Sequence, residues 1–219
     1  MKDYGAEAKR VHELVQARRP GARTLLDVGC GTGTHLEHLA RYYEVEGLDL
    51  DPEMLAVARE RLPGVPLHQA DMAAFELGRT FDAVVCLFSS IAYVRTVDRL
   101  ERAVASMAGH LEPGGVLVLE PWVRPEQWDP ARLHAVFVDE PDLKIARMSV
   151  PPPLAREQTL EFHYLVATRS GVEHFTERHE IGMFTHEEYA GAVGAAGLRV
   201  ESETEGLMGR GLYVGVRGA

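Results

Sequence analysis

The segment from Leu25 to Thr34, which reads LLDVGCGTGT, constrains the fold of this chain more than any other. A short apolar run leads directly into a turn in which every second residue, Gly29, Gly31 and Gly33, is a glycine. Residues without a Cβ let a ligand approach bare backbone at the carboxyl end of a strand, and the helix that follows offers free N–H groups. The segment therefore predicts the first strand, ligand-binding loop and helix of an α/β sheet.

The residues around this loop indicate which kind of ligand it binds. A dinucleotide fingerprint needs a third glycine three residues after the second, but Thr34 occupies that position. The strand also carries Asp27 just before the loop, and its carboxylate would repel a pyrophosphate. A carboxylate there suits a cationic ligand such as S-adenosylmethionine (SAM), which has an ammonium group and a sulfonium but no phosphate. The alternative is a tight strand-to-helix turn that binds no ligand.

Two further acids follow the strands that we expect next in the chain. Asp49 ends a predicted strand roughly 20 residues past the glycine loop, where an acid accepts hydrogen bonds from ribose hydroxyls. Asp71 follows another short strand and can accept a hydrogen bond from an adenine amino group, or it can simply cap a turn. Met54 and Met72 can lie against the purine ring, although core filling is at least as common for a methionine. Together the acids predict a SAM site.

These motifs resemble those of the class I SAM-dependent methyltransferases. The resemblance covers most of the chain, including the glycine loop, Asp49, Asp71, the strand FDAVVC at 81–86 and the stretch LEPGGVLVL at 111–119. Within that family, several segments are similar to the bacterial amino-sugar N,N-dimethyltransferases, of the kind that finish desosamine and mycaminose. These segments are KDY at 2–4, LFSSI at 87–91, EPW at 120–122, EFH at 161–163 and GRGLYVG at 209–215.

The chain departs from the sugar enzymes in two places. In those enzymes a Gly-His pair follows the FSSI run and its histidine faces the substrate amine, whereas this chain has Ala92 and Tyr93 there. They also begin with a longer, tyrosine-rich segment that helps to close the cofactor site, whereas this sequence starts almost at Lys2, Asp3 and Tyr4. The resemblance therefore implies a shorter lid or a missing start, and it leaves the acceptor of the methyl group open.

The resemblance and the expected fold together assign a cofactor site and an acceptor site. The cofactor is SAM, with S-adenosylhomocysteine (SAH) as its product. Its expected contacts are the loop, the acids at strand ends and neighbouring apolar side chains, namely Asp27, Gly29, Cys30, Gly31, Thr32, Gly33, Asp49, Leu50, Met54, Asp71, Met72 and Leu87. The expected catalytic residues are Tyr93, which can orient the acceptor, and Glu120, which can hold an ammonium group before it is deprotonated.

The expected substrate contacts are Trp122, Arg147, His163 and Arg210. The two arginines match positions where the sugar enzymes meet a nucleotide diphosphate, and the planar guanidinium suits phosphate. Each acceptor-site residue also has a structural interpretation. Tyr93 and Trp122 can be aromatic walls, Glu120 can cap the insertion, His163 can share an exposed sheet face with Glu161, and both arginines can be solvated. No group of residues has the spacing of metal ligands, so no metal site is expected.

Composition narrows the choice of partners and compartment. A net charge of −10 argues against a nucleic-acid substrate, because nucleic-acid binders carry a basic face. No apolar run is long enough to span a bilayer, and the start lacks the order of a signal peptide. The two cysteines, Cys30 and Cys86, do not suggest a disulfide framework, so a reducing cytoplasm is the expected location.

The order of apolar runs predicts a seven-stranded, mostly parallel, Rossmann-like α/β sheet. Residues 24–120 alternate short apolar runs with helical patterns, including a helix over 97–111. Period-two alternation then begins, with a strand around 160–166 and a partner at 175–181. We therefore assign 1–121 and 184–219 to the SAM-binding domain and 122–183 to an antiparallel β cap over the carboxyl ends of the parallel strands, inserted after the fifth strand.

The leading hypothesis is a methyltransferase that acts on a small molecule, with the amine of a nucleotide-linked amino sugar as one acceptor. Two alternatives stay open. One is a SAM-binding module without catalysis. The other is a nicotinamide-dependent oxidoreductase, which Asp27 and Thr34 disfavour. We also expect a homodimer built through the inserted strands, because a sheet with no obvious second cover leaves an edge or a face to protect.

Overall fold

The computed structural model describes residues 2–219, which form two β-sheets and the helices around them. The larger sheet has seven strands in the order β10-β11-β5-β4-β1-β2-β3. All neighbours from β5 to β3 pair in parallel, and only β11 runs against its neighbours. This topology confirms the predicted Rossmann-like fold. The strands are β1 (Thr24–Val28), β2 (Glu44–Asp49), β3 (Leu67–Gln69), β4 (Phe81–Cys86), β5 (Leu111–Leu119), β10 (Leu198–Glu203) and β11 (Leu212–Arg217).

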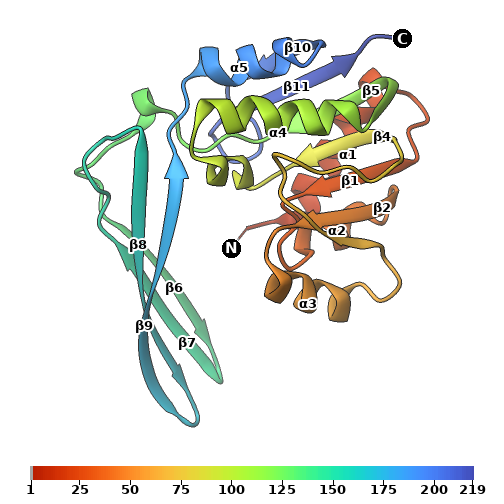
Figure 1. The fold of residues 1–219 in the computed structure, drawn as a ribbon. Helices are drawn as coiled ribbons and strands as arrows, with labels where there is room; N and C mark the ends of the chain where they lie inside the picture. The colour runs from red at the N-terminus through yellow and green to blue at the C-terminus, as the bar shows by residue number, and fades with distance from the viewer. Residues whose placement is uncertain (1) are drawn as a thin grey trace.

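Helices cover both faces of this sheet (Figure 1). The helices α1 (Tyr4–Arg18) and α2 (Thr34–Leu39) pack on one face, while α4 (Val97–Gly109) and α5 (His186–Ala195) pack on the other. The helix α3 (Pro52–Arg61) lies beside β2 and β3. Side chains alternate along β1, so Leu25 joins the core under α1 and α2, whereas Leu26 and Val28 join the core under α4 and α5. The central strands are therefore apolar on both faces.

Local caps fix where the helices next to the site begin. The Asp51 carboxylate accepts hydrogen bonds from the backbone N–H groups of Glu53 and Met54, and Pro52 follows it at the first helical position of α3. Thr185 and Glu188 cap the start of α5 reciprocally, each side chain accepting a bond from the other's backbone N–H. The sequence itself predicts both caps, because Asp51 precedes a proline at a predicted helix start and Thr185 and Glu188 have the spacing of a capping box, and the structure contains both.

The helix expected over 97–111 ends two residues early. α4 stops at Gly109, and Leu111 begins β5 by pairing with Phe81 of β4. Leu111 is fully buried in the sheet core, as it would be at the end of an amphipathic helix. Helical spacing alone therefore could not separate the last apolar residue of the helix from the first of the strand.

A second, four-stranded antiparallel sheet is inserted between β5 and α5 and extends away from the body of the molecule (Figure 1). Its strands, in the order β6-β7-β8-β9, are β6 (His134–Glu140), β7 (Leu143–Ser149), β8 (Glu157–Thr168) and β9 (Gly171–Gly182). The expected strands around 160–166 and 175–181 lie within β8 and β9. The strands β6 and β7 were not predicted individually. The boundaries at 122 and 183 stay a prediction.

The inserted sheet meets the body at a close backbone contact. A short 3₁₀ helix, η1 (Ser90–Val94), follows β4, and the residue after it, Arg95, has a φ of +67°. Gly182, at the end of β9, lies so close that a Cβ there would be 2.5 Å from the Arg95 carbonyl oxygen. The Arg95 guanidinium also pairs with Glu157 of β8 and Glu180 of β9, at 2.8 and 2.5 Å. These contacts hold the base of the inserted sheet against η1.

No helix in the part of the chain that the structure describes is both long and apolar enough to cross a membrane.

Candidate functional site

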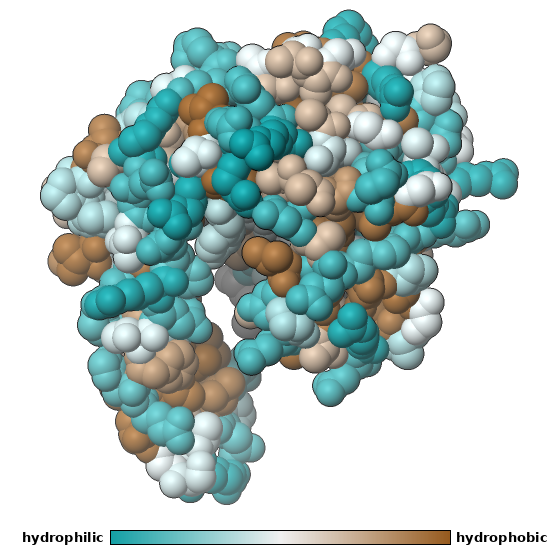
Figure 2. Space-filling view, viewed as in Figure 1, coloured by the Kyte–Doolittle hydropathy of each residue, from teal (hydrophilic) through white to brown (hydrophobic). Residues whose placement is uncertain are grey.

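A cavity of about 1040 Å³ opens at the carboxyl ends of β1, β2 and β4. Figure 2 shows the surface hollowed between the inserted sheet and the body. The expected residues that line it are Asp27, Gly29, Cys30, Gly31, Thr32, Asp49, Leu50, Met54, Asp71, Met72, Leu87 and Tyr93. Ligand clefts in open α/β sheets lie at this edge of the sheet.

The glycine loop forms the floor of the cavity because its backbone is left-handed. Gly29 and Gly31 have φ values of +75° and +55°, a region that favours glycine. A Cβ on Gly29 would lie 2.6 Å from the Cβ of Ser90, whose hydroxyl donates to the Gly29 carbonyl. A Cβ on Gly31 would meet nothing within 4 Å, so bare backbone faces the cavity there.

The third glycine of the loop has a different task. Gly33 does not line the cavity but precedes α2 with a φ of +76°, and a Cβ there would press on Leu62 and Ala58 next to α2. Gly33 is therefore outside the cavity lining, and its contact with the cofactor stays a prediction.

Asp49 ends β2 with its carboxylate held by backbone donors. The N–H of Gly31 donates to Oδ2 at 2.7 Å, and the N–H of Asp51 donates to Oδ1 at 3.0 Å. Each oxygen has a further lone pair, and Asp49 lines the cavity. The carboxylate is thus fixed in place and can accept two more hydrogen bonds, as a pair of adjacent ribose hydroxyls requires.

Asp27 is the most deeply placed of the three acids that line the cavity at strand ends, with 2% of its surface exposed. Burial, with added repulsion from the Asp49 carboxylate, raises the pKa of Asp27 to about 7. Burial disfavours the ionised form of a carboxyl, whereas a nearby cation favours it. A ligand that brings a positive charge to this end of the cavity is therefore stabilised by Asp27.

Asp71 lies at the other end of the acid row and is paired with an arginine. Both of its oxygens accept from Arg99 of α4, at 3.0 and 2.8 Å, and Oδ1 also accepts from the Ala73 N–H. Burial alone would raise the pKa of Asp71, but these bonds outweigh it and lower the pKa. Met72 lies next to Asp71 in the lining, and Met54 lies in the wall formed by α3. This end of the cavity offers hydrogen-bonding groups to the edge of a flat heterocycle and polarizable methionine side chains to its faces.

Among the residues that the structure describes, His179 of β9 is the one lining residue that comes from the inserted sheet. Tyr93 of η1 points its hydroxyl at His179 of β9, with Oη 2.6 Å from Nδ1. Burial raises the pKa of the Tyr93 phenol, and the carboxylates of Glu177 and Asp49 add to the effect. Tyr93 is thereby neutral across the physiological range.

Behind the lining residue Phe88 lies a buried carboxylate. Glu120, at the end of β5, is fully buried, and its Oε2 accepts from the Phe88 N–H at 2.6 Å. Its Oε1 has no hydrogen-bond partner within residues 2–219. Burial raises the pKa of Glu120, although the Phe88 N–H and the cations of Lys2 and Arg210 oppose the shift. Lys2 stands over the Phe88 ring, 3.5 Å from its centre.

Arg210 and Trp122 belong to the same cluster as Glu120. The Arg210 guanidinium lies 4.6 Å from the centre of the Trp122 ring and donates to the Ser89 hydroxyl at 2.8 Å. Burial lowers the pKa of Arg210. The expected residues Glu120, Trp122 and Arg210 thus come together, but one layer behind the cavity wall and not in it.

The two remaining expected residues lie on opposite faces of the inserted sheet. Arg147 pairs in register with Tyr164, lies 5.0 Å from the Phe162 ring and shares a face with His179. His163 is on the other face, where it pairs with Glu161 at 3.1 Å and stacks on His174. The structure therefore brings Arg147 toward the cavity side of the sheet, whereas His163 faces away from it.

Several lining residues escaped the sequence analysis. They are Tyr4, Thr34, His35, Leu48, Asp51, Pro52, Glu53, Ala70, Phe88, Ser90, Val94, Arg99 and His179. A usable signal existed for Phe88 and Ser90, which belong to the FSSI run beside Tyr93. Among the other residues of this list, His35 bonds the buried Glu7 at 2.8 Å.

The donor set of the cavity fits SAM. An acid with a raised pKa would meet the ammonium group of SAM at one end, and a fixed carboxylate would meet its ribose hydroxyls in the middle. The left-handed glycines leave the backbone open between them. A pyrophosphate would instead lie against two carboxylates, so the chemistry of the site disfavours a dinucleotide.

Comparisons with known proteins agree with this site. Residues 25–115 match the family described as "Methyltransferase domain". The chain is 48% identical to the dTDP-3-amino-3,4,6-trideoxy-alpha-D-glucopyranose N,N-dimethyltransferase of Streptomyces venezuelae, covering 98% of this chain and 92% of that one. It is 44% identical to the dTDP-3-amino-3,6-dideoxy-alpha-D-glucopyranose N,N-dimethyltransferase of Streptomyces fradiae, covering 100% and 86%.

A solved structure extends the likeness to the cofactor. The SAM-bound amino pentose methyltransferase CalS10 from Micromonospora echinaspora superposes with a TM-score of 0.92 at 46% identity, covering 99% of this chain and 92% of that one. The predicted cofactor, SAM, is confirmed at the level of the family, while the contacts of individual residues with it stay predictions.

Proposed function

The chain belongs to the SAM-dependent sugar N,N-dimethyltransferases, and from that premise we propose that it methylates the amine of a dTDP-linked amino sugar twice in succession. The proposal rests on the observation that a single cavity has two walls of different chemistry. One wall has the acids Asp27 and Asp49 at strand ends, and the other has Tyr93 and the inserted sheet. The likeness to sugar enzymes over nearly the whole chain includes that inserted sheet.

On the cofactor side, the residues of this chain hold and orient SAM. SAM supplies an activated methyl group on a sulfonium. Asp27 receives the ammonium end, Asp49 holds the ribose hydroxyls, and Asp71 with Met72 accommodates the adenine. The leaving group is neutral, so the protein needs to align the acceptor and exclude water more than to donate a proton.

On the acceptor side, Tyr93 orients the amine at the mouth of the cavity. Arg147 lies on the cavity side of the inserted sheet and suits the diphosphate, because a guanidinium fork matches phosphate oxygens. Glu120, Trp122 and Arg210 support Phe88 from behind and so shape the wall between the two ligands. An amine accepts a methyl group only through a free lone pair, which makes its protonation state part of the reaction.

The test is a turnover assay with the two acceptors that the relatives' names specify. Purified enzyme is incubated with SAM and either dTDP-3-amino-3,4,6-trideoxyglucose or dTDP-3-amino-3,6-dideoxyglucose, and products are followed by mass spectrometry. We expect gains of one and then two methyl groups on one or both acceptors. The corresponding 3-hydroxy sugar nucleotide is the matched control and should remain unmethylated. Methylation of neither amino sugar, in a protein that binds SAH, would disprove the assignment.

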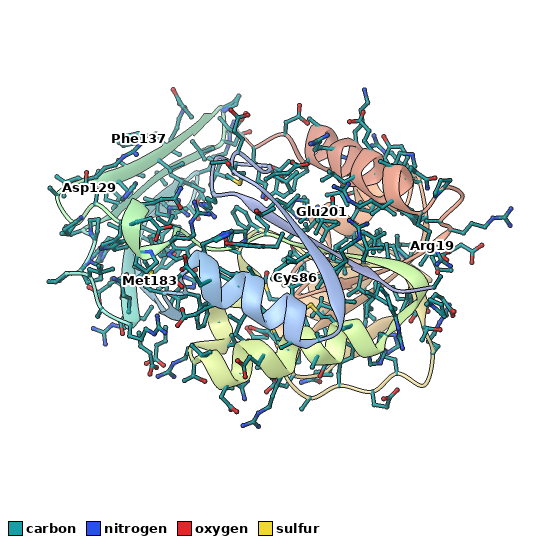
Figure 3. The ribbon with its side chains drawn as sticks, turned by 90° about the horizontal axis from the view of Figure 1, so that it is seen from above. Arg19, Cys86, Asp129, Phe137, Met183 and Glu201 are labelled. Atoms are coloured by element: carbon teal, nitrogen blue, oxygen red, sulfur yellow. The ribbon has the colours of Figure 1, made fainter. Side chains whose placement is uncertain are left out.

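We also propose that the chain forms a homodimer through the outer face of the inserted sheet, meaning the face that carries Phe137, Met148 and Leu165. These side chains are 67%, 50% and 50% exposed, and the strand register puts them on the face opposite His179. Figure 3 shows Phe137 at the far end of the molecule from Arg19. Large exposed apolar patches mark interfaces. The cytoplasmic location stays a prediction.

Sedimentation tests the dimer. At micromolar concentration we expect the wild-type chain to sediment as a dimer and Phe137→Glu as a monomer, because a buried unpaired charge opposes association. Leu154→Glu, at an exposed apolar position outside the four strands, serves as the control and should leave the dimer intact. A wild-type monomer, or a dimer unaffected by Phe137→Glu, contradicts this interface.

A further inference from the structure

Three side chains form a row at the mouth of the cavity, joining η1 to the inserted sheet through one hydrogen bond and one longer contact between an imidazole and a carboxylate. The hydroxyl oxygen of Tyr93 lies 2.6 Å from Nδ1 of His179, and Nε2 of His179 lies 3.5 Å from Oε2 of Glu177. Tyr93 and His179 both line the cavity. A hydroxyl on one imidazole nitrogen and a carboxylate on the other is the arrangement in which histidine takes up a proton.

The surroundings hold this row in place and set its charges. Glu177 and His179 are two residues apart on β9 and so share one face, and the Phe162 ring of β8 meets the imidazole edge-on at 5.2 Å. The other titratable side chains that the strand register puts on this face are Tyr164 of β8, Arg147 of β7, Glu173 of β9, and His134 and Glu140 of β6. From the body, the carboxylate of Asp49 faces Tyr93. The carboxylates of Asp49 and Glu177 together favour a positive charge between them.

We propose that His179 accepts the proton of the acceptor amine through Tyr93, with Glu177 stabilising the imidazolium. The bound ammonium group gives a proton to Tyr93 Oη while the Tyr93 hydroxyl proton passes to His179 Nδ1. One N–H bond of the ammonium breaks, one Nδ1–H bond forms, and the tyrosine is neutral before and after. The electron pair stays on the amine nitrogen, which is then free to accept a methyl group.

The same row serves both methylations. The first transfer leaves a monomethylated ammonium, which must lose a proton before a second methyl group can be accepted. The imidazolium therefore has to return its proton to water between turnovers, and 29% of the His179 side chain is exposed to allow this. The proposal rests on the proposed function, because only an amine acceptor requires such a step. It gives the inserted sheet a chemical task at the cavity.

The experiment compares His179→Asn, Glu177→Gln and His174→Gln with the wild type, using the amino sugar that the wild type methylates. His174 lies on the opposite face of β9 and is the control. At pH 7 we expect kcat to fall about 10²-fold in His179→Asn, the usual range for a lost general base, and less in Glu177→Gln. The dissociation constant of SAH, measured by calorimetry, should stay within about twofold of wild type because the cofactor wall is untouched.

The pH profile separates a proton acceptor from a structural support. As the pH rises from 7 to 9, solution supplies more neutral amine, so the deficit of His179→Asn should shrink by about tenfold per unit up to the pKa of the amine. His179→Asn should also accumulate the monomethylated product, and added imidazole should restore part of the activity of His179→Ala.

Two outcomes have different meanings. Normal kcat in His179→Asn, or a deficit that is the same at pH 7 and pH 9, overturns the relay and leaves the proposed function standing. A wild-type enzyme that binds SAH but methylates no amine overturns the proposed function, and the relay with it.

Discussion

The state of Asp27 predicts how cofactor binding depends on pH. Its pKa is raised to about 7 by burial and by Asp49, so roughly one tenth of the free enzyme carries an ionised Asp27 at pH 6, half at pH 7 and nine tenths at pH 8. The ammonium group of SAH needs the ionised form. Apparent affinity scales with the competent fraction. SAH should therefore bind about fivefold tighter at pH 7 than at pH 6, and about twofold tighter again at pH 8.

The same shift has the opposite effect on the stability of the free enzyme. The pKa of Asp27 is higher in the folded state than the ordinary value of 3.8, so the folded state binds more protons between about pH 4 and pH 7. Stability then falls as the pH rises through that window and levels off above it. The ionisation of Asp27 lowers the free energy of unfolding by at most about 4 kcal/mol. Asp27→Asn removes the ionisation, so this part of the pH dependence of unfolding should vanish.

Isothermal calorimetry measures the linkage directly. SAH is titrated at pH 6, 7 and 8 in two buffers of different ionisation enthalpy, which counts the protons released. We expect about 0.9 proton per SAH at pH 6 and about 0.1 at pH 8. Asp27→Asn is the matched control, because any titration of the SAH amine itself persists in it. Equal wild-type affinity at pH 6 and pH 8, or the same slope in Asp27→Asn, would refute the reasoning.

Two further predictions concern the walls of the cavity. Asp49→Ala should weaken SAH binding by about 1–3 kcal/mol in calorimetry, because a charged hydrogen-bond partner of the ribose is lost, and unchanged affinity in a folded variant would contradict that role. Gly182→Ala should lower kcat at least about tenfold with SAH affinity intact, since a Cβ 2.5 Å from the Arg95 carbonyl oxygen displaces β9 from Tyr93. Gly191→Ala, whose Cβ meets nothing within 4 Å, is its control.

The cofactor half of the site could be predicted from the sequence because its residues are local in the chain. The loop around Gly31 and the acids Asp27, Asp49 and Asp71 each sit at the end of one strand, and parallel strands bring such ends together. Gly33 was the exception. Its alternating position in the loop suggested a ligand contact, but it starts α2 and packs against Leu62.

The acceptor half could not be predicted to the same depth, because it is assembled from residues far apart in the chain. Tyr93 and His179 meet across 86 positions, and nothing in the weak alternation of β9 indicates which face turns toward the body. The pairing of the strands decides which side chains face the body. We assigned Arg147 and His163 to the substrate together, but the register of β7 and β8 puts them on opposite faces of the inserted sheet. Glu120 was placed correctly at a strand end but lies behind Phe88.

The charges of the two walls determine which way round the proposed acceptor must lie. The chain carries a net charge of −10, and Asp27 and Asp49 concentrate negative charge on the cofactor side. A diphosphate placed there would meet two carboxylates, whereas along the inserted sheet it meets Arg147. The phosphates of the proposed acceptor are therefore directed outward along that sheet. Its amine is directed inward, toward Tyr93, where a cation is attracted by Glu177 and Asp49 until its proton is removed.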